Sequence, residues 1–355
     1  MNALKVIILY NKLFHYRLPV WNCLAEKCDL TVAYTYGDGS VPVGVECKFK
    51  RLHLPAKKYF GRFVIHKDNI RKLVKDYDVV VIYSDISWLK YSTLPFFNNK
   101  KVVIHTIGVS ASYDKGYDEH KEWDYVRKFF YNKADSLAFY TYYPIEKYAK
   151  MGVKREKMFV AINTVAVSQI PKKMEKDSIL MIGTLYRQKG IQYLLDAYLK
   201  LRNVCDLPVL NIVGKGPDEQ VIKAWIDEHG MEDLVKMRGA IYDIEEKSRY
   251  FGRAFACISP MQAGLTVLES MGYGVPFVTT KNAITGGEIF NIHNGIDGVV
   301  MENVNELVDV IKDICVNNEK YIEMGKSAKN YYNNNCTPEH MAMGLWNAIC
   351  YACKQ

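Results

Sequence analysis

Two stretches decide the fold: Cys257–Pro276, CISPMQAGLTVLESMGYGVP, and Gly183–Gly190, GTLYRQKG. Each follows a short apolar run, Phe255–Ile258 or Ile179–Ile182, that is typical of a buried parallel strand. Each also leads into a segment whose apolar residues have helical spacing. Two strand–loop–helix units place helix N-termini, with free N–H groups and a positive dipole end, near the carboxyl edge of one sheet. This arrangement predicts a site for an anionic phosphate group.

The same residues carry a family resemblance. GTLYRQKG resembles the G-x-L-x-x-x-K-G segment of the retaining glycosyltransferases of family four, which have the two-domain GT-B fold. CISPMQAGLTVLESMGYGVP is similar to that family's donor-sugar segment, in which two glutamates stand eight positions apart. Glu269 matches the second glutamate, whereas Met261 stands at the position of the first. Val213–Glu219 and Thr285–Val300 add further matches, so the resemblance is specific over about residues 155–335.

Strands and helices alternate along the chain, which predicts parallel sheets covered by helices. The periodicity fails near Thr164–Ser178, where Pro171 precedes the charged run KKMEKD, and this is the expected linker. The sequence therefore predicts an α/β protein of two doubly wound, Rossmann-like domains that face each other across a cleft. The expected domains are 1–165 (acceptor side), 166–336 (nucleotide-sugar donor) and 337–355, a C-terminal helix that the resemblance implies will pack back on the first domain. Expected helices of the first half include Tyr16–Lys27, Arg62–Lys75 and Lys121–Asn132.

Charge is distributed unevenly along the 355 residues. Residues 1–170 contain 27 Lys and Arg against 16 Asp and Glu, whereas residues 171–355 contain 20 against 23. A basic half predicts an anionic partner, and nucleic acid is not expected because no nucleic-acid-binding module is present. The densest basic patch interleaves with Tyr59, Phe60 and Phe63. It predicts either contact with an anionic membrane surface or a solvated loop, and its members are Lys48, Lys50, Arg51, Lys57, Lys58 and Arg62.

Localisation follows from what the chain contains. No apolar run reaches the roughly 18–20 residues needed to span a bilayer. The N-terminal LKVIILY is typical of a strand and not of a signal peptide. Nine irregularly spaced cysteines fit the reduced thiols of the cytosol. We therefore expect a cytoplasmic protein, peripheral on the inner face of the membrane.

Transfer of a sugar from a nucleoside diphosphate leaves negative charge on the departing diphosphate, so the catalyst needs fixed positive charge there. The resemblance implies this role for Lys189, with Arg187 supplying the charge that the family often places at the position of Thr184. Glu269 matches a glutamate that accepts hydrogen bonds from the ribose hydroxyls. His105 resembles the histidine that the family places across the cleft, near the donor sugar.

The candidate catalytic residues are thus Lys189, Arg187 and His105. The candidate donor-binding residues are Gly183, Thr184, Gly214, Arg238, Met261, Gly264, Leu265, Thr266 and Glu269. On the acceptor side Arg17 is either a contact for the acceptor or a phosphate, or an ordinary surface arginine. Because Met261 cannot accept a strong hydrogen bond from a sugar hydroxyl, the donor sugar stays open, and Ser259 or Gln262 could compensate in part.

The sequence predicts no metal site, because its His, Cys and carboxylate residues form no cluster with metal-ligand spacing. The resemblance implies a metal-independent retaining hexosyltransferase without a cofactor, whose substrates are a nucleoside-diphosphate sugar and a glycan or lipid-linked acceptor. Surface polysaccharide or glycolipid synthesis is the expected setting. A nucleotide-sugar 2-epimerase and a non-catalytic nucleotide-sugar-binding subunit remain alternatives, and Met261 favours the second of them.

Overall fold

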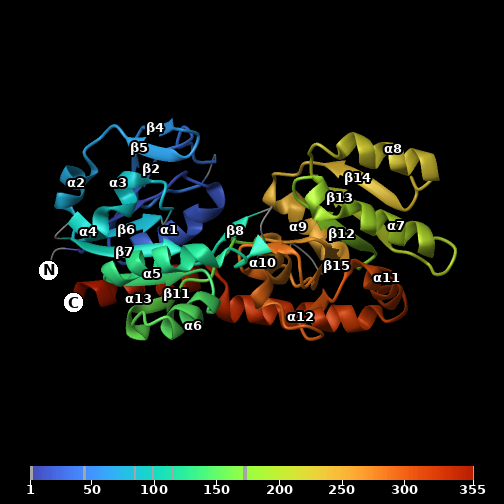
Figure 1. Ribbon diagram of the computed structural model, residues 1–355. Helices are drawn as coiled ribbons and strands as arrows, with labels where there is room; N and C mark the ends of the chain where they lie inside the picture. The colour runs from blue at the N-terminus through green and yellow to red at the C-terminus, as the bar shows by residue number, and fades with distance from the viewer. Residues whose placement is uncertain are drawn as a thin grey trace. The chain divides into compact units, whose positions relative to one another are not determined.

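A computed structural model describes residues 3–42, 45–83, 85–97, 100–112, 116–170 and 174–354. The chain divides into two compact units, each built around a parallel sheet (Figure 1). The first unit comprises residues 1–110, 120–164 and 337–355, and the second comprises residues 111–119 and 165–336. The predicted fold class, two doubly wound α/β domains, is confirmed. None of the described helices combines the length and the apolar character that crossing a bilayer requires.

The first unit is built on seven strands, and every neighbouring pair of strands is parallel. In spatial order these strands are β11 (Met158–Val160), β10 (Ser136–Phe139), β7 (Lys101–Thr106), β6 (Val79–Tyr83), β1 (Lys5–Leu9), β2 (Asp29–Tyr34) and β3 (Lys50–His53). Its helices are α1 (Leu18–Ala25), α2 (Ile70–Leu73), α3 (Leu89–Ser92), α4 (Leu94–Phe97), α5 (Asp124–Lys133), α6 (Tyr143–Lys150) and α13 (Pro338–Lys354). The apolar strand residues are buried on both faces of the sheet, as is usual for parallel strands.

The second unit has a six-stranded sheet, again with parallel neighbours throughout. Its strands, in spatial order, are β14 (Val235–Gly239), β13 (Val209–Val213), β12 (Ser178–Ile182), β15 (Ala254–Ile258), β17 (Phe277–Thr280) and β19 (Gly298–Met301). The helices are α7 (Ile191–Leu201), α8 (Glu219–His229), α9 (Ile244–Arg253), α10 (Thr266–Gly272), α11 (Leu307–Val316) and α12 (Asn318–Asn335). A short parallel pair, β16 (Gln262–Ala263) and β18 (Ile284–Thr285), lies beside this sheet.

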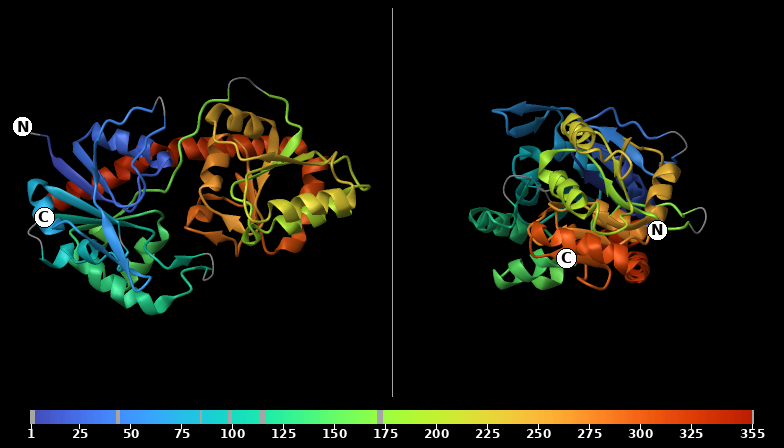
Figure 2. Two further views of the ribbon diagram at one scale, coloured as in Figure 1. Left: turned by 90° about the horizontal axis from the view of Figure 1, so that it is seen from above. Right: turned by 90° about the vertical axis from the view of Figure 1, so that its right-hand side faces the viewer.

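The C-terminal helix α13 packs on the first unit, where it contacts α1, β7, β10 and β11 (Figure 2). Its closest approach is at Gly344, where an added Cβ would overlap the carbonyl oxygen of Val160. Gly344 therefore lets the helix axis come close to the sheet. Between the units, residues 161–170 and 174–177 form neither helix nor strand, and Pro171, within the expected linker, lies outside the described residues.

The expected helix Arg62–Lys75 is wrong over its first half. Phe63–His66 forms strand β5, antiparallel to β4 (Ala56–Tyr59), and only Ile70–Leu73 is α-helical. In β5 the side chains of Val64 and His66 are buried while Phe63 is exposed. This alternation has the period of a strand, and β-branched residues favour it.

A second difference concerns residues 111–119, which the sequence places within the first domain but the structure groups with the second unit. The strands β8 (Ala111–Ser112) and β9 (Gly116–Tyr117) pair antiparallel and contact β18. The ring of Tyr117 meets that of Phe290 edge-on, with centroids 5.2 Å apart. No periodicity in the sequence indicates that residues 111–119 belong with the second unit.

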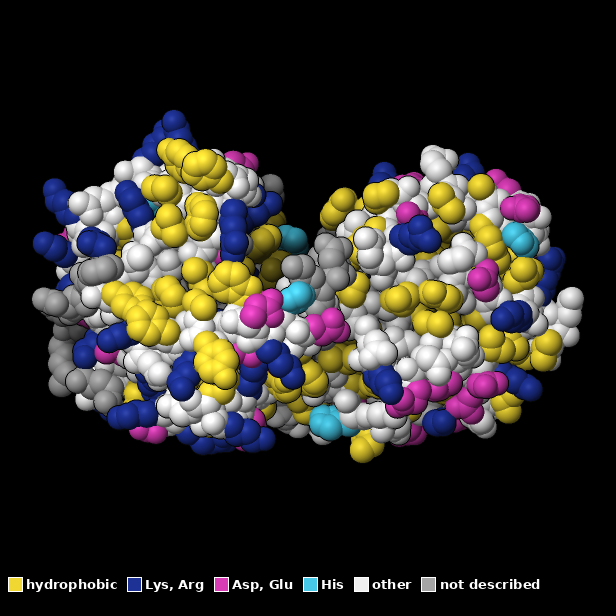
Figure 3. Space-filling view, in the orientation of Figure 1, with side chains coloured by type: hydrophobic (Ala, Val, Ile, Leu, Met, Phe, Trp, Pro, Cys, Tyr) yellow, Lys and Arg dark blue, Asp and Glu magenta, His cyan; other side chains and the backbone are white. Residues whose placement is uncertain are grey.

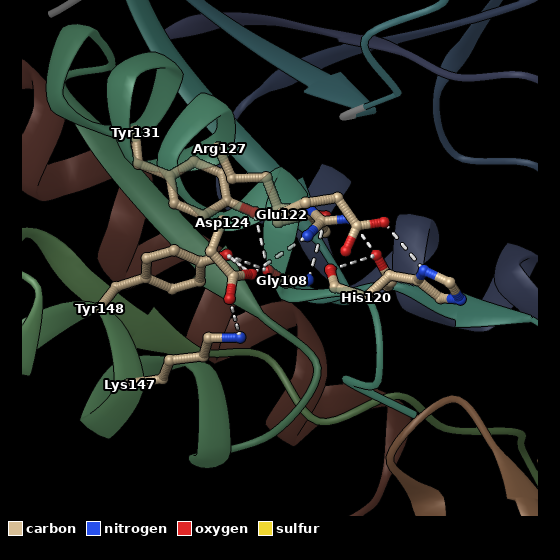
Figure 4. A network of polar contacts seen from close by, with 10 residues as sticks. Gly108, His120, Glu122, Asp124, Arg127, Tyr131, Lys147 and Tyr148 are labelled. Carbon is tan, nitrogen blue, oxygen red and sulfur yellow. Dashed lines mark hydrogen bonds and ion pairs between the residues drawn. The ribbon is translucent and has the colours of Figure 1, made fainter. Parts of the chain in front are cut away.

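A network of polar contacts fixes the chain where it returns to the first unit (Figure 4). The buried carboxylate of Asp124, at the start of α5, lies 2.6 Å from Lys147 Nζ and 3.3 Å from Arg127 Nη1. The hydroxyls of Tyr131 and Tyr148 both donate to the carbonyl oxygen of Gly108, in the turn after β7. Because these contacts are buried, they hold the β7 turn, α5 and α6 together.

Candidate functional site

The order of strands in the second unit places a switch point between β12 and β15. From β12 the chain continues outward to β13 and β14, and from β15 it continues outward on the other side to β17 and β19. Loops leaving the carboxyl ends of two such neighbouring strands diverge and leave a crevice, which is where open α/β sheets bind ligands. The loops at this point are Gly183–Gly190 and Ser259–Leu265, the two stretches that the sequence singles out.

The loop after β12 buries a lysine. Lys189 is only 4% exposed, and its Nζ donates to the carbonyl oxygen of Ile182 over 2.8 Å. An added Cβ on Gly183 would lie 2.5 Å from that Nζ, and Gly183 has a φ of +120°, so only glycine suits this position. The loop ends at Gly190, in the left-handed conformation, and helix α7 follows at once.

Burial lowers the pKa of Lys189 to about 8, and the neighbouring Cys257 thiol opposes this shift. The cause is desolvation, which disfavours the charged form of an amine. The described hydrogen bond of this buried ammonium goes to a neutral carbonyl. An anion that binds beside the ammonium would therefore stabilise its charged form. The carboxyl end of β12 is therefore arranged to favour a negatively charged ligand.

The Met261 segment is attached to the same loop. The backbone N–H of Met261 donates to the carbonyl oxygen of Lys189 over 3.2 Å, and Ile284 N donates to Met261 O over 2.8 Å. The Met261 side chain lies against Gly190, because a Cβ added there would be 2.8 Å from Met261 Cγ. The structure thus brings Met261 and Lys189 together. Nearby, the hydroxyl of Ser259 is buried, and the described residues offer it no hydrogen-bond partner.

Glu269 lies one turn into α10 and forms an ion pair with Lys247 of α9. The two side chains are 13% and 20% exposed, so both charges are largely removed from water. Burial raises the pKa of the Cys257 thiol to about 12, the charge of Lys189 opposes that shift, and the charge of Glu269 adds to it. The charges of both candidates, Lys189 and Glu269, therefore act on the same buried thiol. Sequence reasoning missed Lys247, because no motif marks it.

The glycines of this edge divide into two kinds. Gly214 has a φ of +153°, and an added Cβ would overlap the carbonyl oxygen of Gly183, so the loops after β12 and β13 touch through their backbones. Gly264 has no atom within 4 Å of an added Cβ, so the space beside it is open. Leu265 and Thr266 follow it, half-buried, at the start of α10.

The remaining donor candidates lie farther out. Thr184 and Arg187 are exposed on the β12 loop. Arg238 is also exposed. Its Nε donates to Asn211 Oδ1 over 2.8 Å, and it lines a cavity of about 400 Å³ together with Ser178 at the start of β12. Arg238 itself lies near the carboxyl end of β14, and its side chain reaches Asn211, in the middle of β13.

In the first unit, His105 ends up inside an aromatic cluster. It is fully buried near the carboxyl end of β7, with ring centroids 4.9 Å from Tyr140 and 6.5 Å from Trp21. Burial, followed by the charge of Arg17, lowers the pKa of His105 to about 3. The imidazole is therefore neutral at any physiological pH.

Arg17 lies in the same cluster, at the end of the turn that precedes α1. It is 2% exposed, so the interpretation of Arg17 as an ordinary surface arginine is wrong. Its guanidinium donates to Asn163 Oδ1 and, over 2.8 Å, to the sulfur of Met341 on α13. It also lies 5.3 Å from the centroids of both the Tyr16 and the Tyr140 rings. Sequence reasoning missed Asn163, although it lies shortly after the carboxyl end of β11, and a place at a strand's carboxyl end is the kind of signal that identified His105.

Two α/β units with parallel sheets, one of which buries a lysine at its switch point, define the class of protein by fold. Over residues 164–331 the chain matches the family model described as "Glycosyl transferases group 1". At the level of the group 1 glycosyltransferases, this match bears out the resemblance found in the sequence, and nearly all of the matched residues belong to the second unit.

Two curated relatives carry glycosyltransferase names, and a solved structure shares the fold. The chain is 27% identical over 180 residues to an uncharacterized glycosyltransferase of Haemophilus influenzae, covering 47% of each chain. It is 21% identical over 169 residues to the GDP-mannose-dependent alpha-(1-6)-phosphatidylinositol monomannoside mannosyltransferase of Mycobacterium tuberculosis, covering 44% of this chain and 43% of that one. The chain thus spans about half the length of the curated relatives it matches. The fold is similar to that of HepE from Anabaena, solved in complex with UDP, with a TM-score of 0.73, 15% identity and coverage of 98% of this chain and 100% of HepE.

Proposed function

We propose that the protein is a metal-independent retaining glycosyltransferase of the hexosyl type, which moves a sugar from a nucleoside-diphosphate sugar to a glycan or lipid-linked acceptor. Its setting would be surface polysaccharide or glycolipid synthesis in the cytoplasm. The observation that carries the proposal is the desolvated ammonium of Lys189 at the carboxyl end of β12, bonded through its own backbone to the Met261 segment. HepE, which has the same fold, has been solved with UDP and with UDP-glucose, and this supports a nucleotide sugar as the donor.

In the proposed reaction the bond between the anomeric carbon and the diphosphate oxygen breaks, and negative charge grows on that oxygen. Lys189 lies at the strand end where this charge would develop, and an ammonium that is already desolvated interacts strongly with it. The acceptor hydroxyl attacks from the face that the diphosphate leaves, and its proton passes to the diphosphate oxygen. No enzymic nucleophile takes part. Product analysis tests the proposal directly, since a glycoside with retained anomeric configuration supports it, whereas an epimerised nucleotide sugar contradicts it.

Replacing Glu269 with alanine is expected to weaken binding of the free nucleoside diphosphate by about 1–3 kcal/mol. The reason is that the carboxylate accepts hydrogen bonds from the ribose diol, a contact that needs no sugar. Calorimetry with UDP and GDP measures the loss. Lys247→Met is the matched control, because it removes the ion pair and keeps the carboxylate, and it should cost less affinity. Equal losses of affinity in the two variants would mean that Glu269 acts only as the ion-pair partner of Lys247 and does not bind the ribose.

The proposed metal independence rests on which side chains and backbone groups are available to stabilise the diphosphate. Among the described residues no group of three or more His, Cys, Asp or Glu side chains is arranged to hold a metal ion. Lys189 and the backbone N–H groups of the carboxyl edge provide positive charge of their own. We therefore expect EDTA to leave the rate of sugar transfer unchanged. Loss of activity that manganese or magnesium restores would contradict the metal-free mechanism.

The basic first unit is proposed to contact an anionic membrane surface through the hairpin of β4 and β5. The space-filling view shows hydrophobic side chains over this hairpin and over α5, with Lys and Arg side chains around them (Figure 3). Phe60, at the tip, is 94% exposed and has a φ of +50°, a conformation that costs a bulky residue energy. Lys48 and Lys50 are paired with carboxylates, but for the lysines of the hairpin the described residues provide no such partner.

Reversing Lys57, Lys58 and Arg62 to glutamate is expected to release the protein from anionic vesicles at low salt. Attraction to such a surface amounts to about 1 kcal/mol per basic residue and falls off within a Debye length. Sedimentation with vesicles of anionic and of neutral lipid measures it. The control reverses three exposed lysines of the second unit, Lys200, Lys223 and Lys312, with the same change of charge. Equal release by both triple variants would show that net charge, and not the hairpin, is responsible.

A further inference from the structure

Arg17 carries a buried positive charge that no carboxylate balances among the described residues. Its described hydrogen-bond acceptors are an amide oxygen and a thioether sulfur, both neutral. The groups around it are the rings of Tyr16 and Tyr140 and the hydroxyl of Tyr10, which is bonded to that of Tyr140. A guanidinium stays protonated in a protein, and burying it without a counter-charge is costly. Proteins normally pair such a charge.

The same cluster holds further polar atoms that are buried and unpartnered in the described part of the chain. They are Arg17 Nε, Trp21 Nε1 and both ring nitrogens of His105. A neutral imidazole keeps one N–H, so at least three hydrogen-bond donors face no acceptor. Leaving buried donors unsatisfied is itself unfavourable. What the cluster lacks is a negatively charged acceptor.

The cluster also lies at the ligand-binding edge of its own sheet. From β1 the chain continues outward to β2 and β3, and the later strands β6, β7, β10 and β11 extend on the other side. The switch point of the first unit is therefore between β1 and β6. Tyr10 directly follows β1, and Arg17 follows it within one short turn. Open α/β sheets bind ligands at such a point.

We propose that this set of residues, the Arg17 cluster, binds an oxyanion of the acceptor, a phosphate or carboxylate group, which replaces Asn163 on the guanidinium. The inference rests on the proposed function, since it specifies the chemistry of the acceptor. Asn163 is 8% exposed and Arg17 is 2% exposed, so Asn163 is the more accessible partner of this hydrogen bond. An amide oxygen makes a weaker bond to arginine than an oxyanion does, because a planar guanidinium matches phosphate or carboxylate with two parallel hydrogen bonds.

Asn163→Asp is the decisive variant, because it places a permanent carboxylate where the oxyanion would bind. It is nearly isosteric with the wild type and should raise the melting temperature in the absence of ligand. Arg17→Met is the second variant, since replacing a buried, unbalanced charge with an apolar chain of similar length need not destabilise a fold.

The measurement is thermal stability in phosphate, pyrophosphate and glucuronate, against chloride at equal ionic strength. Wild type is expected to melt about 2 °C or more higher in the anion that binds, through mass action. Both variants should lose that shift. A shift with phosphate or pyrophosphate identifies a phosphorylated acceptor, and a shift with glucuronate alone identifies an acidic sugar.

UDP affinity, measured by calorimetry, should be the same in the wild type and in Asn163→Asp, because the donor residues belong to the second unit. Loss of UDP binding in the wild type itself would contradict the proposed function and not the Arg17 cluster. The inference is overturned if none of the three anions shifts the wild type, or if Asn163→Asp keeps the full shift. It is also overturned if Asn163→Asp melts below the wild type. Arg17 would then have only a structural role, joining Asn163 to α13 through its hydrogen bonds. If Arg17→Met fails to fold, Asn163→Asp alone decides the test.

Discussion

Lys189→Met is expected to lower the turnover of sugar transfer about 10²–10³-fold, the usual effect of removing one donor that stabilises transition-state charge. Methionine keeps the length of the side chain, so it opens no cavity next to Gly183. The variant should fold, because it also removes a desolvated charge. Initial rates at saturating nucleotide sugar measure the effect, and thermal melting checks the fold.

The pH dependence provides an independent signature of the same group. With a pKa of about 8, Lys189 is protonated below that pH and loses its charge above it. Nucleoside-diphosphate affinity should therefore fall as the pH rises through about 8 in the wild type. Lys189→Arg, which keeps its charge throughout, should show a flat profile.

Stability should move in the opposite direction. The folded pKa of Lys189, about 8, lies below the value of 10.5 for the unfolded chain. Between these two values Lys189 binds more protons in the unfolded chain, so its own contribution to the free energy of unfolding rises with pH. Lys176 and Lys157 also have lowered pKa values and contribute in the same direction to both proteins. The difference in slope between the wild type and Lys189→Met therefore reports the contribution of Lys189. If Lys189→Met kept near wild-type rates and the wild-type pH profile of nucleotide affinity, Lys189 would not be part of the site.

Gly214→Ala is expected to destabilise the second unit by about 3 kcal/mol or more, since overlap and backbone strain act together. The new methyl group would meet a backbone oxygen, that of Gly183, which cannot rotate away as a side chain does. The φ of +153° adds strain for any residue with a Cβ. Denaturant unfolding measures the loss.

Gly264→Ala is the matched control for this substitution. The same methyl group meets no atom within 4 Å there, and Gly264 is not among the glycines with positive φ. Its free energy of unfolding should stay within about 1 kcal/mol of the wild type, as for a helix-end glycine. Equal destabilisation by the two substitutions would mean that the close approach of the β12 and β13 loops contributes little to stability.

Most sheet strands of both units could be predicted from the sequence, because parallel strands buried on both faces are continuous apolar runs. The edge strand β3 was not predicted, since three of its four residues are exposed and it has no apolar run. The two strands expected beside the site, Ile179–Ile182 and Phe255–Ile258, are present as β12 and β15, and each begins one residue earlier than expected. Phe63–His66 was assigned to a helix because four residues give too short a window to separate a period of 2 from one of 3.6. Its partner β4 is basic and exposed, so it carries no apolar signal.

The site could be predicted less completely, for a physical reason. Sequence patterns locate strand ends, so Lys189, Met261 and His105 were found at carboxyl edges. They do not report burial or side-chain direction. Nothing in the sequence shows that Lys247 reaches Glu269 from another helix, or that the sulfur of Met341 accepts a hydrogen bond from Arg17, 324 residues earlier in the chain.

The assignment of residues 111–119 to the second unit has a consequence for anyone who recombines such proteins. The chain passes from one unit to the other after residues 110, 119, 164 and 336. A chimaera joined only at 164 and 336 would inherit a foreign segment against Ile284–Thr285 and Phe290. Successful exchange of the second unit between relatives therefore requires residues 111–119 to be exchanged together with 165–336, as a second, non-contiguous piece of the module.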